Sequence, residues 1–172
     1  MLMQQTRILA GALMSALVII AVVIYVVLSA QEDVLALPPL WVFAAQAAAG
    51  VAVHTVVEAV GYRAPALDPS LDRDEALRQA RASYQTLMIT RFALCESIAI
   101  ASLAGAFILQ EGGWVGYVSG AVVSLALMAV HVWPGPRPID KVQASLQRNG
   151  SRVPLREAFG LDHKLSGPIQ EL

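Results

Sequence analysis

Four ionisable side chains lie inside two apolar stretches in the middle of the chain, and these are the residues most able to do chemistry. The first stretch holds His54 and Glu58, and the second holds Arg91 and Glu96. Ionisable groups deep in a bilayer are costly unless they are paired or hydrated, so they often mark a function. Counting about 1.5 Å of rise per helical residue, Glu58 and Arg91 reach one depth, which predicts a structural ion pair. His54 and Glu96 reach a greater depth, which predicts a second pair that could handle a proton or another ion.

The same residues allow a metal site only as an alternative. His54 and Glu58 share one helical face and, together with Glu96 or His131, would be an acceptable zinc ligand set. This spacing is common by chance, so we predict neither a metal nor a cofactor. The sequence contains no Ser-His-Asp order, no Gly-rich phosphate loop and no HExxH motif, so we do not expect an enzyme.

The composition predicts that these residues lie in a membrane protein. Of the 172 residues, 56% are hydrophobic and 15% are charged, whereas about a quarter of the residues of a soluble domain are charged. The net charge of −1 gives no basic excess that would favour nucleic acid as a partner. The single cysteine excludes an intramolecular disulfide. The expected partner is therefore the lipid bilayer.

Four stretches are long enough to cross a bilayer, which takes about 20 apolar residues as a helix. These predicted spans are 8–29, 40–60, 87–109 and 114–133. We therefore predict an all-α, polytopic four-transmembrane-helix bundle in residues 1–133. The first span could instead be a signal peptide cleaved near Leu28-Ser29-Ala30, but its apolar run is too long for one, and we expect it to be retained.

The basic residues predict the orientation. Of the 12 Lys and Arg residues, all except Arg91 lie outside the spans and on the same side of the membrane. Because cytoplasmic loops carry the excess of Lys and Arg, both termini and the loop 61–86 are expected in the cytoplasm. The chain would then be a multi-pass protein of a bacterial inner (plasma) membrane. In this loop, Asp72 with Glu75 has capping-box spacing and predicts one helix that continues into the third span.

The cytoplasmic tail, residues 134–172, should contain one short helix. Ile139, Val142 and Leu146 would share one face of it. This pattern is typical of an amphipathic helix at the membrane surface, and a solvated helix is an equal alternative. From Ser151 onward we expect little fixed structure.

Small residues predict how two of the spans pack. Helices in lipid associate through small side chains that let their backbones approach. The third span has such residues at four-residue spacing at Ala93, Ser97, Ala101 and Gly105, and the fourth has them at Gly116, Gly120 and Ser124. A very short turn joins the two spans, so we expect antiparallel neighbours whose two stripes face each other.

The second and third spans carry a local resemblance. The run Thr86-Leu-Met followed by Glu96 resembles the second helix of the rotary ATP synthase proteolipid, subunit c, in which an essential carboxylate lies ten residues after a similar entry. Val57-Glu58-Ala59-Val60-Gly61, with Arg63 and Pro65 after it, is similar to the end of that family's first helix. The resemblance implies that Glu96 carries a proton or another ion. It covers only these two spans, so we expect a proteolipid-like hairpin inside a different membrane protein.

Three functions follow from the sequence. The first is a non-enzymatic subunit or accessory of a membrane assembly, in a homo- or hetero-oligomer with other membrane proteins. The alternative is a proton- or ion-handling protein that uses Glu96 with His54. A membrane-embedded enzyme comes third.

Overall fold

The computed structural model of the protein describes residues 2–30, 34–109 and 112–161, and all regular elements in these ranges are helices. They are α1 (Leu2–Leu28), α2 (Leu40–Val60), α3 (Arg73–Ile108), α4 (Gly113–His131), α5 (Pro136–Leu146) and α6 (Leu155–Ala158). The helices α1 to α4 are long and apolar enough to cross a membrane. The predicted all-α fold with four membrane-spanning candidates is therefore confirmed.

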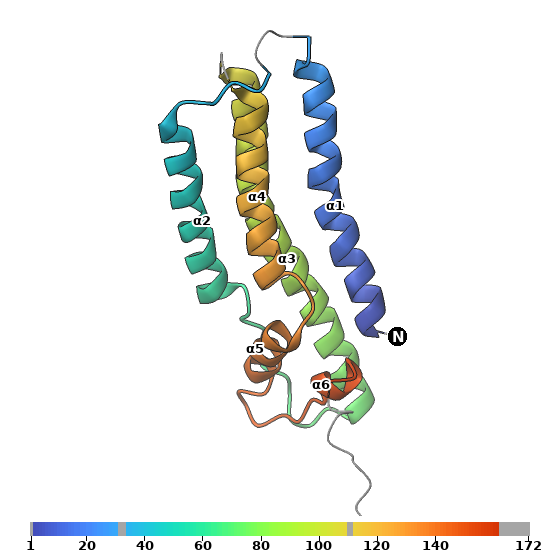
Figure 1. Ribbon diagram of the computed structural model, residues 1–172. Coiled ribbons are helices and arrows are strands. Elements are labelled where there is room, and N and C mark those ends of the chain that lie inside the picture. Colours follow the sequence, from blue (N-terminus) through green and yellow to red (C-terminus); the bar gives the residue numbers. More distant parts are fainter. Residues whose placement is uncertain (1, 31–33, 110–111, 162–172) are drawn as a thin grey trace, which may run out of the picture.

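The four long helices alternate in direction around a central hairpin (Figure 1). The hairpin consists of α3 and α4, which make the most extensive contact in the molecule. Helix α1 packs on α4, and α2 packs on both α3 and α4 from the other side. The prediction that the third and fourth spans are antiparallel neighbours is therefore confirmed.

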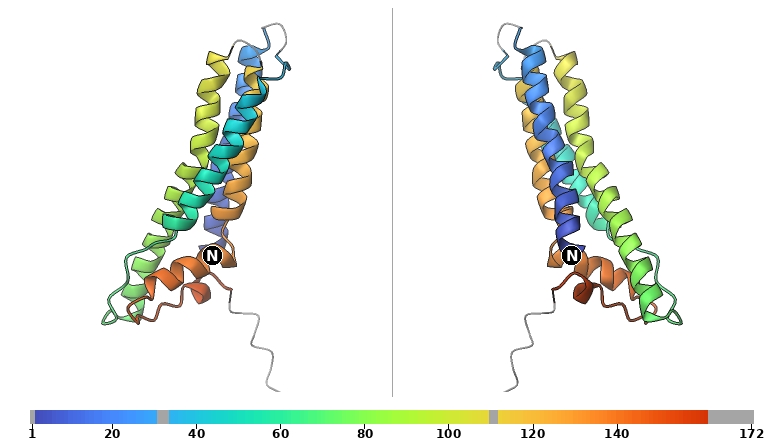
Figure 2. Two further views of the ribbon diagram at one scale, coloured as in Figure 1. Left: turned by 90° about the vertical axis from the view of Figure 1, so that its left-hand side faces the viewer. Right: turned by 90° about the vertical axis from the view of Figure 1, so that its right-hand side faces the viewer.

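Helix α3 extends well past the other long helices at the end where the chain begins (Figure 2). It starts as the sequence predicted, because the Asp72 side chain accepts a hydrogen bond of 2.9 Å from the Glu75 amide. Asp74 and Glu75 place negative charge in its first turn, which complements the positive end of the helix dipole. No break follows before Ile108, so the predicted single long helix is confirmed.

The start of α4 requires a glycine. Gly112 has a φ of +69°, a conformation that side chains with a Cβ rarely adopt. A Cβ at this position would also collide with the backbone of Pro38 and would lie 2.7 Å from the Leu37 carbonyl carbon. The connection between α1 and α2 therefore passes directly against the tip of the hairpin. The other parts of the predicted outer loops, residues 31–33 and 110–111, lie outside the described residues.

The outer surface of α1 is apolar along most of its length. Val18, Ile19 and Val22 each expose more than half of their surface, although this helix faces α4 with Leu17 and Ile24 almost completely buried. A water-soluble protein rarely exposes a continuous apolar face of this kind. A lipid environment removes that cost, which is consistent with membrane insertion.

The tail folds back onto the bundle, which differs from both alternatives for its amphipathic helix. Ile139, Val142 and Leu146 are completely buried, because the apolar face of α5 packs against α3 and α6. This face is therefore covered by the chain itself and is available neither to lipid nor to water. The expectation of little structure after Ser151 is wrong for α6, whose Leu155 joins the same core. Residues 162–172, including Lys164, lie outside the described residues.

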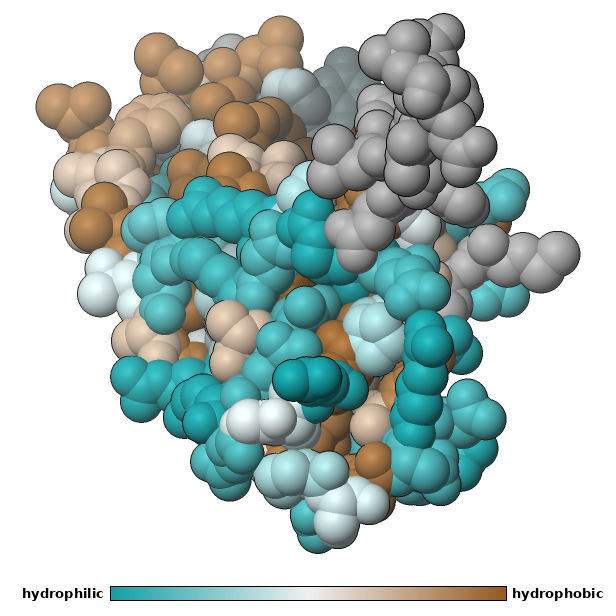
Figure 3. Space-filling view, turned by 90° about the horizontal axis from the view of Figure 1, so that it is seen from below, coloured by the Kyte–Doolittle hydropathy of each residue, from teal (hydrophilic) through white to brown (hydrophobic). Residues whose placement is uncertain are grey.

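This folded tail gives the bundle a hydrophilic end. Viewed from below, the surface over α5, α6 and the start of α3 is dominated by polar and charged side chains, and the apolar residues of the long helices lie behind it (Figure 3). The molecule therefore has an apolar body and one polar cap. This is the shape expected of a membrane protein whose polar part lies on one side of the membrane.

Candidate functional site

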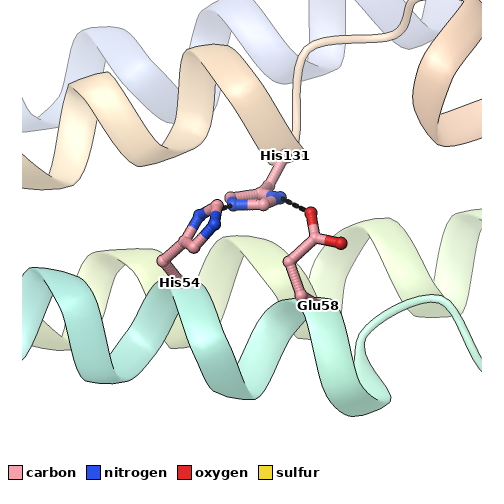
Figure 4. A group of neighbouring side chains, drawn as sticks. All are labelled: His54, Glu58 and His131. Atoms are coloured by element: carbon pink, nitrogen blue, oxygen red, sulfur yellow. Dashed lines mark hydrogen bonds and ion pairs between the residues drawn. The ribbon is translucent and has the colours of Figure 1, made fainter.

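Three ionisable side chains meet where α2 and α4 end, next to the polar cap. His54 and Glu58 lie one turn apart on α2, and His131 is the last residue of α4 (Figure 4). His54 Nδ1 and His131 Nε2 are 2.9 Å apart, so one ring donates a hydrogen bond to the other. On its other side, His131 Nδ1 lies 3.8 Å from Glu58 Oε1. We call these three residues the histidine–carboxylate cluster.

The central ring of the cluster is fixed from several directions. His131 is completely buried, and its Nδ1 lies 2.8 Å from the Tyr62 hydroxyl. Burial raises the pKa of Tyr62, so its phenol stays protonated at neutral pH and can donate to this nitrogen. Both nitrogens of His131 are therefore engaged, which ties α2 to α4 at this level of the bundle.

The arrangement is a row, not a shell around a point. His131 uses opposite nitrogens toward His54 and toward Glu58, and it lies between them (Figure 4). One ligand atom from each of the three residues lies within 4.8 Å of the others. However, a zinc ion would need ligand atoms that converge on it. It would also compete for Glu58 with Arg137 and Lys141, which form ion pairs with this carboxylate. The contacts instead form a chain from His54 through His131 to Glu58.

Glu58 has partners that the sequence analysis missed. Its carboxylate accepts a hydrogen bond of 2.8 Å from Arg137 and forms a second ion pair with Lys141, both from the α5 region. The folded tail therefore supplies both cations that bind Glu58. The predicted pair of Glu58 with Arg91 is wrong, because each of the two side chains is bound elsewhere.

Arg91 binds the ends of two helices. It is completely buried; its Nε donates 2.8 Å to the His131 carbonyl and its Nη1 donates 2.9 Å to the Gly61 carbonyl. Gly61 caps the C-terminus of α2 and His131 ends α4, so these carbonyls have no partner within their own helices. The guanidinium also lies 4.6 Å from the centre of the Tyr62 ring. The C-terminal ends of α2 and α4 carry partial negative charge, and Arg91 binds them instead of the predicted Glu58 carboxylate.

Glu96 does not join the cluster. The predicted pair of His54 with Glu96 is wrong, since His54 is bonded to His131. Glu96 is partly buried on α3. The cluster lies between α2 and α4, and no described hydrogen bond or ion pair joins Glu96 to it.

Of the two predicted rows of small residues, the row on α4 lies inside the bundle and the row on α3 lies on its outer surface. On α4, Gly116, Gly120 and Ser124 are buried in the bundle. Opposite them, Ala99 donates its amide to Ser124 Oγ at 3.0 Å, and a Cβ on Gly120 would lie 2.6 Å from Ser102 Cβ. The buried face of α3 therefore contains Cys95, Ala99, Ser102 and Ala106.

The predicted packing face of α3 is consequently wrong. Ala93, Ser97 and Ala101 are exposed, and Gly105 is only partly buried with open space next to its Cα. Two rows of small residues run along this helix, and the turn into α4 places the other row inside. The predicted row, which we call the outer α3 stripe, thus faces out of the bundle.

An apolar groove lies beside the outer α3 stripe. It has a volume of about 420 Å³ between α2 and α3, at the end of the bundle away from the polar cap. Its lining is mostly small or apolar and includes Ala45, Ala49, Ala101, Ala104 and Gly105. We call it the α2–α3 groove.

The polar side chain of Gln46 is part of the lining of the α2–α3 groove. Gln46 is buried; its Nε2 donates to Ser102 Oγ at 3.0 Å and to the Gly116 carbonyl at 2.7 Å, and its Oε1 accepts from Ser119 Oγ at 2.7 Å. These bonds satisfy the amide and join α2, α3 and α4. The sequence shows Gln46 in register with His54 and Glu58, and this polar row was the available signal for a residue that faces the hairpin.

No protein-family model, curated protein or solved structure matches the chain.

Proposed function

We propose that the protein is a non-enzymatic subunit or accessory of a membrane assembly, and that the α2–α3 groove receives a transmembrane helix of a second copy or of another membrane protein. The main observation behind this proposal is the outer α3 stripe. Its residues are small and mostly exposed, even though the core of the bundle is tightly packed. Small residues on a lipid-facing surface contribute little to the packing of their own bundle. They allow the backbone of another helix to approach closely.

The shape of the surface supports the same proposal. Ala101 and Gly105 belong both to the outer α3 stripe and to the lining of the α2–α3 groove. The groove and the stripe are therefore continuous, and together they offer a long depression to a helix that runs along the bundle. Lipid chains can also fill such a depression, but a helix gains many more fixed van der Waals contacts there.

Substitution of Ala101 tests this assembly. Ala101→Leu would fill the groove, so we expect the purified protein in a mild detergent to lose its oligomeric or partner-bound mass and to appear as a monomer by native mass measurement. The control is Ala126→Leu, at an exposed position of α4 outside the groove, which should keep the mass of the unchanged protein. A monomeric mass for the unchanged protein would contradict the proposal, and so would an assembly that Ala101→Leu leaves intact.

The placement in the membrane is part of the proposal. The basic residues favour a multi-pass protein of the inner (plasma) membrane with the polar cap and both termini in the cytoplasm. Arg63, Lys141 and Arg148 all belong to the end where α2 and α4 stop, which supports this orientation.

Cysteine labelling checks the orientation. In a variant with Cys95→Ser, a cysteine introduced at position 35 should react with an impermeant maleimide in intact cells, because the connection between α1 and α2 would face outward. A cysteine at position 148 should react only after the cells are opened. Labelling of position 148 in intact cells, with position 35 protected, would reverse the proposed topology.

A further inference from the structure

A second groove lies at the polar cap, between the C-terminal end of α2 and one side of α5. It has a volume of about 440 Å³, and its charged lining consists of Glu58, Arg63, Lys141 and Arg148. Tyr62, Ala59, Ala144 and Ser145 complete the lining. We call it the α2–α5 groove. It lies at the level where the apolar run of α2 ends, which is the membrane surface if the helices cross the bilayer as proposed above.

The charge of the α2–α5 groove is positive. Three cations line it against one carboxylate, and Glu58 is already bound to Lys141 and to Arg137. Within the described ranges, Arg148 donates only to backbone carbonyls, with 2.8 Å to Ala64 and 3.1 Å to Ser145. Arg63 is exposed, and its side chain has no hydrogen bond or ion pair among the described residues. Two guanidinium groups therefore face this groove without a carboxylate partner.

The scaffold under these cations is fixed. Ser145 Oγ accepts a hydrogen bond of 2.9 Å from the Ala64 amide, and the Leu67 amide donates 3.0 Å to the Leu146 carbonyl. These bonds attach α5 to the segment that follows α2. Lys141 also lies over the Tyr62 ring, 4.7 Å from its centre. The backbone that carries the basic side chains is thus fixed before any ligand binds. This lowers the conformational entropy that is lost on binding.

The ligand chemistry follows from charge and position. Guanidinium groups bind phosphate with paired, charge-assisted hydrogen bonds, and basic pockets at the cytoplasmic side of membrane helices bind anionic lipid headgroups. Val56 and Val60, which are 45% and 49% exposed on α2, offer an apolar surface that leads away from the groove into the membrane. A soluble phosphate would make no use of this surface, whereas an acyl chain would.

We propose that the α2–α5 groove binds the headgroup phosphate of an anionic phospholipid, with an acyl chain along the exposed apolar side of α2. Arg63 and Arg148 bind the phosphate, and Lys141 contributes charge while it stays bound to Glu58. The inference rests on the proposed membrane insertion, and it involves the end of the bundle opposite to the α2–α3 groove.

Native mass spectrometry of the full chain in a neutral detergent tests this site. Phosphatidylglycerol should remain bound, phosphatidylcholine should be retained at least tenfold less, and inorganic phosphate should not displace the lipid. Near a membrane surface each cation contributes roughly fivefold to the binding of an anionic lipid. Arg63→Gln should therefore weaken retention about fivefold, and Arg63→Gln with Arg148→Gln about 25-fold.

The control removes the same charge elsewhere. Arg7 and Arg152 are exposed and lie outside the groove, so Arg7→Gln with Arg152→Gln should leave retention unchanged. Equal retention of both lipids, equal loss in this control, or displacement by inorganic phosphate would each overturn the proposal. Arg63→Gln removes no side-chain hydrogen bond or ion pair among the described residues, so this single variant should fold even if Arg148→Gln destabilises the chain. Ala101→Leu, which tests the assembly, should not change lipid retention, so the two proposals can fail separately.

Discussion

Arg91→Leu is expected to destabilise the folded chain more than any substitution of an exposed charge. The change leaves the Gly61 and His131 carbonyls buried without a donor, and each such loss costs about 1–3 kcal/mol. Removal of a buried charge without a carboxylate partner offsets part of this cost. We expect a net loss of roughly 2–4 kcal/mol, seen as a lower midpoint of thermal unfolding by circular dichroism in mild detergent.

Two comparisons make the Arg91 prediction specific. Arg78→Leu on the exposed part of α3 should change the midpoint little, because surface ion pairs contribute little to stability. Arg91→Lys should lie between the unchanged protein and Arg91→Leu, since an ammonium cannot reach both carbonyls with the fork of a guanidinium. In a double-mutant cycle with Glu58→Gln, the coupling should be much weaker than that of a direct ion pair, because the two side chains are connected only through shared neighbours such as His131. A strong coupling between them would contradict the assignment of Arg91 to the helix ends.

Gly120→Ala is expected to separate the central hairpin. The new Cβ would collide with Ser102 Oγ and lie 2.6 Å from Ser102 Cβ and 3.1 Å from Gln46 Nε2. Helix backbones must move apart to relieve this overlap, and overpacking of this kind costs about 1–3 kcal/mol. The midpoint of thermal unfolding should fall clearly, and the bonds of Gln46 should weaken with it.

The Gly120 prediction has a compensating change. Ser102→Gly removes the side chain that the new methyl group meets, so the double variant should be more stable than Gly120→Ala alone. Gly11→Ala is the control, because a Cβ at Gly11 meets nothing within 4 Å, and the helix propensity of alanine should leave stability unchanged or slightly higher. A full-stability Gly120→Ala variant would show that the two helices are not in close contact there.

The sequence was sufficient for the features that depend on local pattern. The apolar runs located both ends of α2 and α4 to within two residues and the C-terminal ends of α1 and α3 to within one, because length and hydropathy alone define such a run. Helix α1 begins six residues before the predicted span. The cap at Asp72 and the unbroken run after it gave the full length of α3, since both signals lie within a few residues of the feature that they determine.

The partners of the buried ions could not be predicted in this way. Matching opposite charges at equal depth paired Glu58 with Arg91, but the alternatives were contributed by distant segments: α5 folds back to bring Lys141 to Glu58, and two helix ends meet at Arg91. The row of small residues that packs inside was equally undetermined, because α3 carries two such rows and only the rotation of the hairpin selects one. His131 was identified only as a possible metal ligand, and its place between His54 and Glu58 depends on how α4 packs on α2.

Cross-linking inside the membrane tests the proposed assembly most directly. A photoreactive amino acid in place of Ala101 should, on illumination of intact membranes, form a protein adduct of one defined mass, either a second copy of the chain or a single partner. The same group in place of Ala126 should give adducts with lipid and no defined protein product. Lipid adducts alone at position 101, or equal protein adducts at both positions, would contradict the account that the α2–α3 groove holds a helix of another subunit.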